Sequence, residues 1–188
     1  FSVIDTSNFQ LISSVSVGNK PWYAAITPDG RKAYISNELS NNVTVVDLSN
    51  MQVKATITVG GEPNGIAITP DSKKAYVGIW RPSGNGAYES ANTVTLIDTE
   101  KDLPVKNIPV GLEPASVVMD PRGTRVFVSD GNANGLQPAE AHIIDTTNDV
   151  YQGSIIVRKA ASYAPTGIDV TPDGRRLFVI SEATETLL

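Results

Sequence analysis

Residues 64–77 read NGIAITPDSKKAYV, and related stretches begin near Trp22, Ala115 and Thr166. A proline in the central turn marks the phase of each copy, and these prolines are spaced by 42, 51 and 51 residues: Pro28, Pro70, Pro121 and Pro172. Each copy consists of short apolar runs separated by turns. A repeat of about 40–50 residues with this content predicts stacked β units, because one unit cannot bury its own apolar face.

One repeat, residues 63–110, shows how the strands are arranged. Apolar residues at 65–69 predict a first strand, and residues 69–72 predict a turn, because proline presets φ and aspartate bonds the following backbone. Further strands are expected at 74–79, 93–98 and 103–110. Positive φ is expected where a glycine ends the first turn, at Gly30, Gly123 and Gly174. The aspartates that end the third strands should close the next hairpin through their side chains: Asp5, Asp47, Asp98 and Asp145.

The composition limits the classes of function. A net charge of −5 over 188 residues, with only 19% charged residues, argues against nucleic acid and anionic membranes as partners. The chain has no cysteine, which excludes disulfides, thiolate metal sites and a cysteine nucleophile. No apolar run approaches the ~20 residues of a membrane-spanning helix. Phe1 is not an initiator methionine, so we expect a processed or cut start.

Four antiparallel strands in 42 to 51 residues are typical of the blade of a β-propeller, an all-β fold. Within 27–47, the turn TPDG and the strands YISN and NVTVVD resemble the YVTN-type β-propeller repeat, and the resemblance covers nearly the whole chain. Proteins with this repeat include surface-layer proteins, extracytoplasmic binding proteins, lactonase-like enzymes and heavy subunits of quinoprotein amine dehydrogenases. The resemblance therefore implies a periplasmic or extracellular propeller, including one at the cell surface. Its first strands should line the channel and be the most buried.

The chain should be a single propeller domain or segment with about four blades' worth of strands: two strands, three full blades and two strands. The end of a blade is expected at 1–20, full blades at 21–62, 63–113 and 114–164, and the start of a blade at 165–188. Three arrangements fit: a self-closed four-bladed ring, two chains that associate by sharing composite blades at their open edges, or a segment of a longer propeller. We expect a segment of a seven-bladed propeller, because 187–188 resembles a third strand cut as it begins.

A binding site is predicted on the face that carries the loops from second to third strands and from each blade to the next. These loops are where the repeats diverge, since the short connection at 38–42 is replaced by long ones at 81–92 and 130–140, with another at 158–164. Aromatic, amide and charged side chains in them can supply binding contacts. The predicted ligand- or partner-binding residues are Trp80, Arg81, Tyr88, Glu89, Asp130, Asn132, Asn134, Gln137 and Tyr163.

The sequence contains few residues that are suited to catalysis or to binding a metal ion or cofactor. His142 is the single histidine and occupies a third-strand position, so we interpret it as a strand-surface residue rather than a ligand or base. Residues 130–135 resemble a calcium loop but lack the terminal glutamate, and 84–86 has the glycines of a phosphate loop without its helix. No catalytic residue, metal site or cofactor is therefore predicted within this chain.

The sequence predicts an extracytoplasmic β-propeller scaffold that binds a ligand or protein partner on its long-loop face and is not catalytic by itself. One alternative is the heavy propeller subunit of a redox complex similar to quinoprotein amine dehydrogenases. The other is a lactonase-type hydrolase, which needs clustered carboxylates in the channel. Glu62 and Glu113 recur before the first strand, but Lys20 and Ala164 stand at the matching positions, so that pattern is incomplete.

Overall fold

The computed structural model describes residues 1–82, 92–111, 113–130, 139–158 and 165–181. Within these ranges the chain is all β, apart from one short 3₁₀ helix, η1 (Glu38–Ser40). Three four-stranded antiparallel sheets form the centre, and a two-stranded sheet lies at each end. The strands in chain order are β1 (Ser2–Ile4), β2 (Leu11–Ser14), β3 (Pro21–Ile26), β4 (Lys32–Asn37), β5 (Asn42–Asp47), β6 (Gln52–Thr58), β7 (Gly61–Ile68), β8 (Lys74–Pro82), β9 (Thr93–Asp98), β10 (Leu103–Pro109), β11 (Pro114–Met119), β12 (Arg125–Asp130), β13 (Ala139–Asp145), β14 (Val150–Arg158), β15 (Pro165–Val170) and β16 (Leu177–Ser181).

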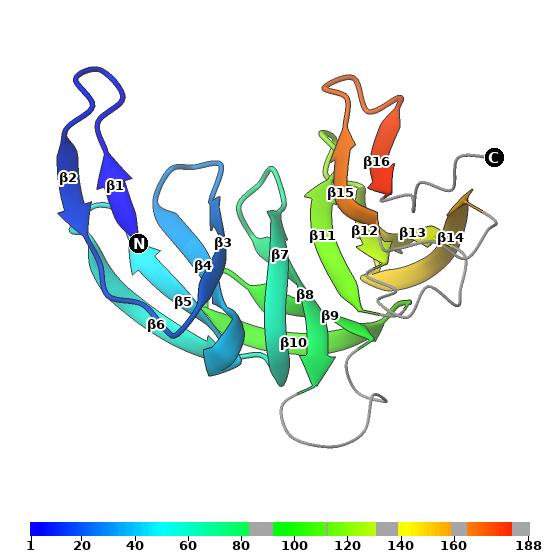
Figure 1. Cartoon of the computed structure of the whole chain (residues 1–188), viewed down its shortest axis with the longest axis horizontal. Helices are drawn as coiled ribbons and strands as arrows, with labels where there is room; N and C mark the ends of the chain where they lie inside the picture. Colours follow the sequence, from blue (N-terminus) through cyan, green and yellow to red (C-terminus); the bar gives the residue numbers. More distant parts are fainter. Residues whose placement is uncertain (83–91, 112, 131–138, 159–164, 182–188) are drawn as a thin grey trace, which may run out of the picture.

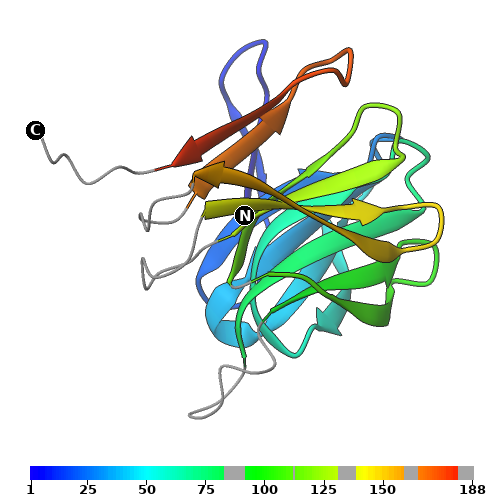
Figure 2. The same cartoon turned by 90° about the vertical axis from the view of Figure 1, so that its right-hand side faces the viewer.

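The five sheets form an arc of β-propeller blades (Figure 1). The first strands of successive blades, β3, β7, β11 and β15, lie next to one another, and each full blade adds its other strands in chain order. The partial sheets β1–β2 and β15–β16 stand at opposite ends of the arc, so the chain is not closed into a four-bladed ring (Figure 1). In the view turned by 90°, the sheets lie one behind another (Figure 2). The predicted blade architecture is confirmed.

The connections between strands lie along two opposite edges of the arc, and the two edges carry different kinds of connection. Because each blade is an antiparallel meander, alternate connections fall on opposite edges. The turn edge carries the turns between first and second strands and between third and fourth strands. The long-loop edge carries the connections from second to third strands and from each fourth strand to the next blade. Helix η1 lies on the long-loop edge, between β4 and β5.

The turn chemistry expected from the sequence is present. Gly30, Gly123 and Gly174 have φ of 71°, 73° and 67°, and each amide donates a hydrogen bond to the carbonyl three residues earlier. In the remaining copy, the second along the chain, Ser72 adopts the same conformation, with φ of 61°. This left-handed region favours glycine, so Ser72 is strained relative to its counterparts.

The aspartates that end the third strands also act as predicted. Each accepts a hydrogen bond on Oδ1 from the backbone amide two residues further along, at 2.7–3.0 Å, and the residues are Asp5, Asp47, Asp98 and Asp145. These exposed carboxylates therefore have a structural role in closing the hairpins.

The second and third strands of the full blades form most of the core. Tyr34 and Val45 of one blade pack in a single cluster with Val77 of the next, and all three are inaccessible to solvent. The prediction that first strands are the most buried is wrong, because β3 is largely exposed, although Ile66 and Val117 in β7 and β11 are buried. A middle strand has neighbours along both edges, whereas a first strand is paired along one edge only.

Candidate functional site

The structure describes part of the predicted binding site. Trp80 and Arg81 end β8, and Asp130 ends β12, so all three lie on the long-loop edge as expected. Trp80 is half-buried and Asp130 is buried. The other predicted residues lie outside the described ranges, and their convergence stays a prediction: Tyr88, Glu89, Asn132, Asn134, Gln137 and Tyr163.

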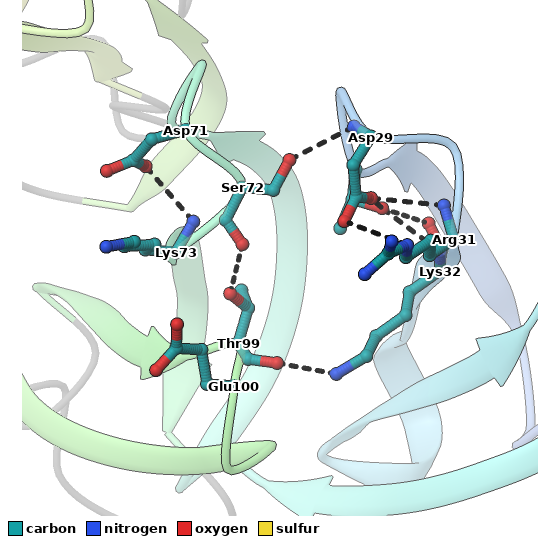
Figure 3. Close-up of a pocket in the computed structure, with 9 residues that line it drawn as sticks. Asp29, Arg31, Lys32, Asp71, Ser72, Lys73, Thr99 and Glu100 are labelled. Carbon is teal, nitrogen blue, oxygen red and sulfur yellow. Dashed lines mark hydrogen bonds and ion pairs between the residues drawn. The ribbon is translucent and has the colours of Figure 1, made fainter.

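A cavity that the sequence did not predict lies on the turn edge, between the first two full blades (Figure 3). Its volume is about 320 Å³. It is lined by the two first-to-second-strand turns and by the start of the turn after β9: Thr27, Asp29, Arg31, Lys32, Asp71, Ser72, Lys73, Thr99 and Glu100.

The polar groups of this cavity bond mainly to one another. The Asp29 amide donates to Ser72 Oγ at 3.1 Å, and the Thr99 hydroxyl donates to the Ser72 carbonyl (Figure 3). Lys32 Nζ donates to the Thr99 carbonyl at 2.5 Å and to both carboxylate oxygens of Asp102 at 2.9 Å. The cavity therefore lies in the contact between two blades, which we call a seam. We assign it to the packing of the blades rather than to ligand binding.

Burial and hydrogen bonding in this seam shift the pKa values of Lys32 and Asp102. Burial lowers the pKa of Lys32, against the opposing effect of its hydrogen bond to Asp102. Burial raises the pKa of Asp102, but hydrogen bonds from Tyr34, Lys32 and Lys54 outweigh it, and the net shift is downward. Charged donors around a buried carboxylate favour its ionised form. The seam thus holds Asp102 as an anion at neutral pH.

On the long-loop edge, the first full blade carries a cation held by its own residues. Lys20 Nζ lies 2.6 Å from Glu38 Oε1 and 5.7 Å from the centroid of the Trp22 ring. Glu38 is buried in η1, whereas Trp22 is 57% exposed at the start of β3. Lys20 itself has a positive φ of 53°. The arrangement combines an ion pair with a cation–π contact.

The third full blade carries a polar chain that runs from the exposed Tyr151, near the turn edge, through the buried His142 to Asp130 on the long-loop edge. His142 Nδ1 lies 3.2 Å from the Tyr151 hydroxyl, and Nε2 lies 3.6 Å from Asp130 Oδ2. The ring packs so closely on Gly111 that a Cβ there would lie 1.9 Å from Nε2. The interpretation of His142 as a strand-surface residue is therefore wrong, since it is 2% exposed. It lies on a middle strand, where Thr44 and Thr95 hold the matching positions and are also buried.

Buried polar atoms without hydrogen bonds gather at the long-loop edge. Asn37 Oδ1 and Glu62 Oε2 lie there and are shielded from solvent, and His142 Nε2 faces the same edge. On the turn edge, the described residues leave no buried side-chain polar atom unpaired. Native proteins pair almost all such groups, so each exception calls for an explanation.

The long-loop edge carries more carboxylates than cations among the side chains that the structure describes. Among the side chains that the structure describes, Lys20 is the one cation there, against five carboxylates: Glu38, Glu62, Glu113, Asp130 and Glu140. Arg81 and Arg158 end strands at this edge. Within the described ranges, no three His, Asp or Glu side chains converge in a way that could hold a metal ion. The described carboxylates of this edge therefore offer hydrogen-bond acceptors.

Comparisons with known proteins support the fold. No protein-family model matches the sequence, and no curated protein matches it either. Among solved structures, hydrazine synthase from Kuenenia stuttgartiensis is similar, with a TM-score of 0.77 and 25% sequence identity. The match covers 92% of this chain and 45% of the hydrazine synthase chain, so this chain spans less than half of that protein. In the described part of the chain, no helix is long and apolar enough to cross a membrane.

Proposed function

We propose that this chain is a β-propeller binding scaffold, without chemistry of its own, whose long-loop edge docks a protein partner. The observation that carries the proposal is the segregation of unpaired polar atoms. Asn37 and Glu62 leave buried atoms unbonded at this edge, while the polar groups of the turn edge bond to one another. A partner that supplied hydrogen bonds would remove the energetic penalty of those unpaired atoms.

On the long-loop edge, equivalent positions of the four blades carry different residues. The residue opposite the first-strand proline is different in every blade: Asn37, Ile79, Asp130 and Ser181. The turn edge, by contrast, repeats the same hydrogen bonds in each copy. Repeated contacts are what the fold requires, so residues that vary between equivalent positions are available for a specific partner.

The resemblance to the YVTN-type repeat supports one further part of the proposal, the location of the protein. Proteins with that repeat are found among surface-layer and extracytoplasmic binding proteins, and we infer that this chain acts outside the cytoplasm. Fractionation of the source cells tests this location: recovery of the protein with cytoplasmic markers would contradict it.

Site-specific photocrosslinking tests the docking edge. One crosslinker replaces Leu39, which is 62% exposed in η1 on the long-loop edge, and a matched one replaces Lys73, exposed on the turn edge. Adducts formed in the source cells should come from position 39 and not from position 73. Adducts from position 73 alone, or equally from both, would overturn the proposal. Trp80→Ala and Tyr88→Ala should lower the adduct yield and leave thermal stability nearly unchanged.

A second candidate is a propeller subunit of a redox complex. The likeness to hydrazine synthase, at 25% identity over 92% of the chain, favours it specifically. In this case the partner, rather than this chain, would carry the redox group. A complex purified through a tag on this chain should then show visible absorbance that changes on reduction, whereas a colourless complex would rule this candidate out.

A further inference from the structure

Trp22 is a large aromatic residue that stands open to solvent on the long-loop edge. It is the second residue of β3, directly after Pro21, and it is 57% exposed. The matching residues of the next two blades, Asn64 and Ala115, are partly exposed, although the first strand of the preceding blade packs beside each of their strands. The position is therefore open in all three full blades, and the first blade presents an indole there.

A buried acid fixes a cation against this indole. Glu38 is buried in η1, and its Oε1 lies 2.6 Å from Lys20 Nζ. The same ammonium lies over the Trp22 ring, 5.7 Å from its centroid. Backbone donors join the two segments, since the Glu38 amide donates to the Lys20 carbonyl at 3.0 Å and the Asn19 amide donates to Ser40 Oγ at 2.7 Å. The indole is therefore supported by η1 as well as by its own strand.

The backbone of this support is strained. Lys20 has a φ of 53°, and Asn41, which caps the end of η1, has a φ of 50°. The left-handed region is unfavourable for a lysine. Strained residues persist where the surrounding contacts hold them, and they gather at functional sites. A fixed, exposed ring also favours binding, because a group that stacks on it does not have to order the ring first.

Lys20 limits what can stack on the exposed part of the ring. The face of an indole attracts cations, and the Lys20 ammonium already uses that attraction. A second cation on the ring would be repelled by Lys20. A carboxylate would be repelled by the negative face of the ring. An uncharged aromatic side chain meets neither penalty, and it gains from the burial of apolar area and from ring stacking.

We propose that Trp22 is the anchor of the docking edge and receives an uncharged aromatic side chain of the partner protein. The inference rests on the proposed docking function and names the chemistry of the partner at that edge. Lys20 and Glu38 are positioning residues, because their ion pair holds the indole and the ammonium disfavours a cationic side chain. Tryptophan is among the residue types enriched at the energetic centres of protein interfaces.

Titration of the ¹⁵N-labelled protein with blocked amino acids tests this chemistry at constant ionic strength. The chain has two tryptophans, so Trp22→Phe identifies the indole N–H signal of Trp22. N-acetyl-phenylalaninamide should shift that signal saturably, and N-acetyl-argininamide should bind about threefold more weakly or worse. In Lys20→Gln the ring has lost its cation, so the argininamide probe should gain affinity and the phenylalaninamide probe should not.

The crosslinker at position 39 tests the anchor in the source cells, because residue 39 directly follows Glu38 in η1. Trp22→Ala should lower the adduct yield by about fivefold or more. The matched Phe9→Ala change removes an 81% exposed aromatic residue from the turn edge and should leave the yield unchanged. Thermal unfolding of both variants shows whether the fold is retained. If Trp22→Ala does not fold, the Lys20→Gln titration decides, since it leaves the indole in place.

Two outcomes of the titration would overturn the proposal. Equal affinity of the two probes for the parent protein, or no gain of the argininamide probe in Lys20→Gln, would show that Lys20 does not select the stacking group. Tighter binding of methyl β-glucoside than of N-acetyl-phenylalaninamide would identify a carbohydrate-stacking site instead.

The two proposals fail separately. Crosslinks from position 39 that persist in a folded Trp22→Ala variant would leave the docking function intact and remove the anchor. Aromatic binding at Trp22 without any crosslink from position 39 would overturn the docking function and leave the selectivity of the indole standing.

Discussion

The Tyr34 hydroxyl in β4 donates a 2.5 Å hydrogen bond to Asp102 Oδ1 in the next blade. The same carboxylate lies 2.9 Å from the ammonium groups of Lys32 and Lys54. One seam further along, Tyr76 makes the equivalent 2.5 Å bond to Asp149. These bonds join consecutive blades through polar groups that are buried or partly buried, so the seams between full blades contain polar as well as apolar contacts.

Removing the hydroxyl should weaken the seam without disturbing its packing. Phenylalanine already stands at the matching second-strand positions of other blades, in Phe127 and Phe178, so the ring is accommodated. Tyr34→Phe and Tyr76→Phe should each lower the free energy of unfolding by about 1–3 kcal/mol, because a buried carboxylate loses a donor. Urea unfolding measures this loss. A change below about 0.5 kcal/mol would mean that the lysines alone satisfy the aspartate.

Acid should weaken the contact between the first two full blades by protonating Asp102. The net pKa of Asp102 in the folded protein lies below its ordinary value of 3.8, since donors from Tyr34, Lys32 and Lys54 outweigh the effect of burial. The stabilisation is therefore present above about pH 4 and is lost as the pH falls through the folded pKa. Asp102→Asn should be less stable than the parent at about pH 7, and the gap should narrow below about pH 4. A gap that stays constant in urea unfolding down to acid pH would contradict this.

Gly30 and Gly123 allow the cost of a strained backbone to be measured separately from the cost of a steric clash. Gly30 and Gly123 have nearly the same φ, 71° and 73°, but a Cβ at Gly30 would meet nothing within 4 Å, whereas one at Gly123 would lie 2.7 Å from Pro70 Cδ. Gly30→Ala should cost about 1–2 kcal/mol from the left-handed backbone alone. Gly123→Ala should cost about 1–3 kcal/mol more, because the turns of adjacent blades would be pushed apart. Equal losses in chemical denaturation would show that Pro70 yields freely.

Gly111 and His142 should behave as a coupled pair. A methyl group on Gly111 would overlap the buried imidazole, so Gly111→Ala should cost about 1–3 kcal/mol. His142→Thr installs the residue that stands at the matching positions of two other blades, Thr44 and Thr95, and frees that space. The double variant should therefore lose less than the sum of the single losses, by about 1 kcal/mol or more. Strict additivity would mean that the ring and the glycine do not contact in solution.

Much of the fold was predictable because its causes are local. The third strand expected at 93–98 coincides with β9 (Thr93–Asp98), and the turn glycines and hairpin-closing aspartates have their expected geometry. The second strand expected at 74–79 continues further, as β8 (Lys74–Pro82). Its extension brings Arg81 into register with Glu62 of β7.

The sequence predicted which edge of the blades carries Trp80 and Asp130, but the role of that edge in binding stays a prediction. The divergence of the loops indicated the correct edge for Trp80 and Asp130. Nothing in the sequence distinguished Asn37 or Glu62, because an unpaired atom is defined by what surrounds it. His142 was misplaced for the same reason, since the blade surface that covers it comes from residues distant in sequence, including Gly111.

By itself, the sequence determined the repeat, the strand order within each blade and the chemistry of each turn. Those features follow from alternation, proline, glycine and aspartate over a few residues, where chain connectivity already places the groups together. Only the tertiary structure decided which polar groups are satisfied across the seams: Tyr34 with Asp102 and Lys74 with Asp149, whereas Glu62 Oε2 has no donor. Such pairs span up to 75 residues, and their geometry exists only after neighbouring blades have packed face to face.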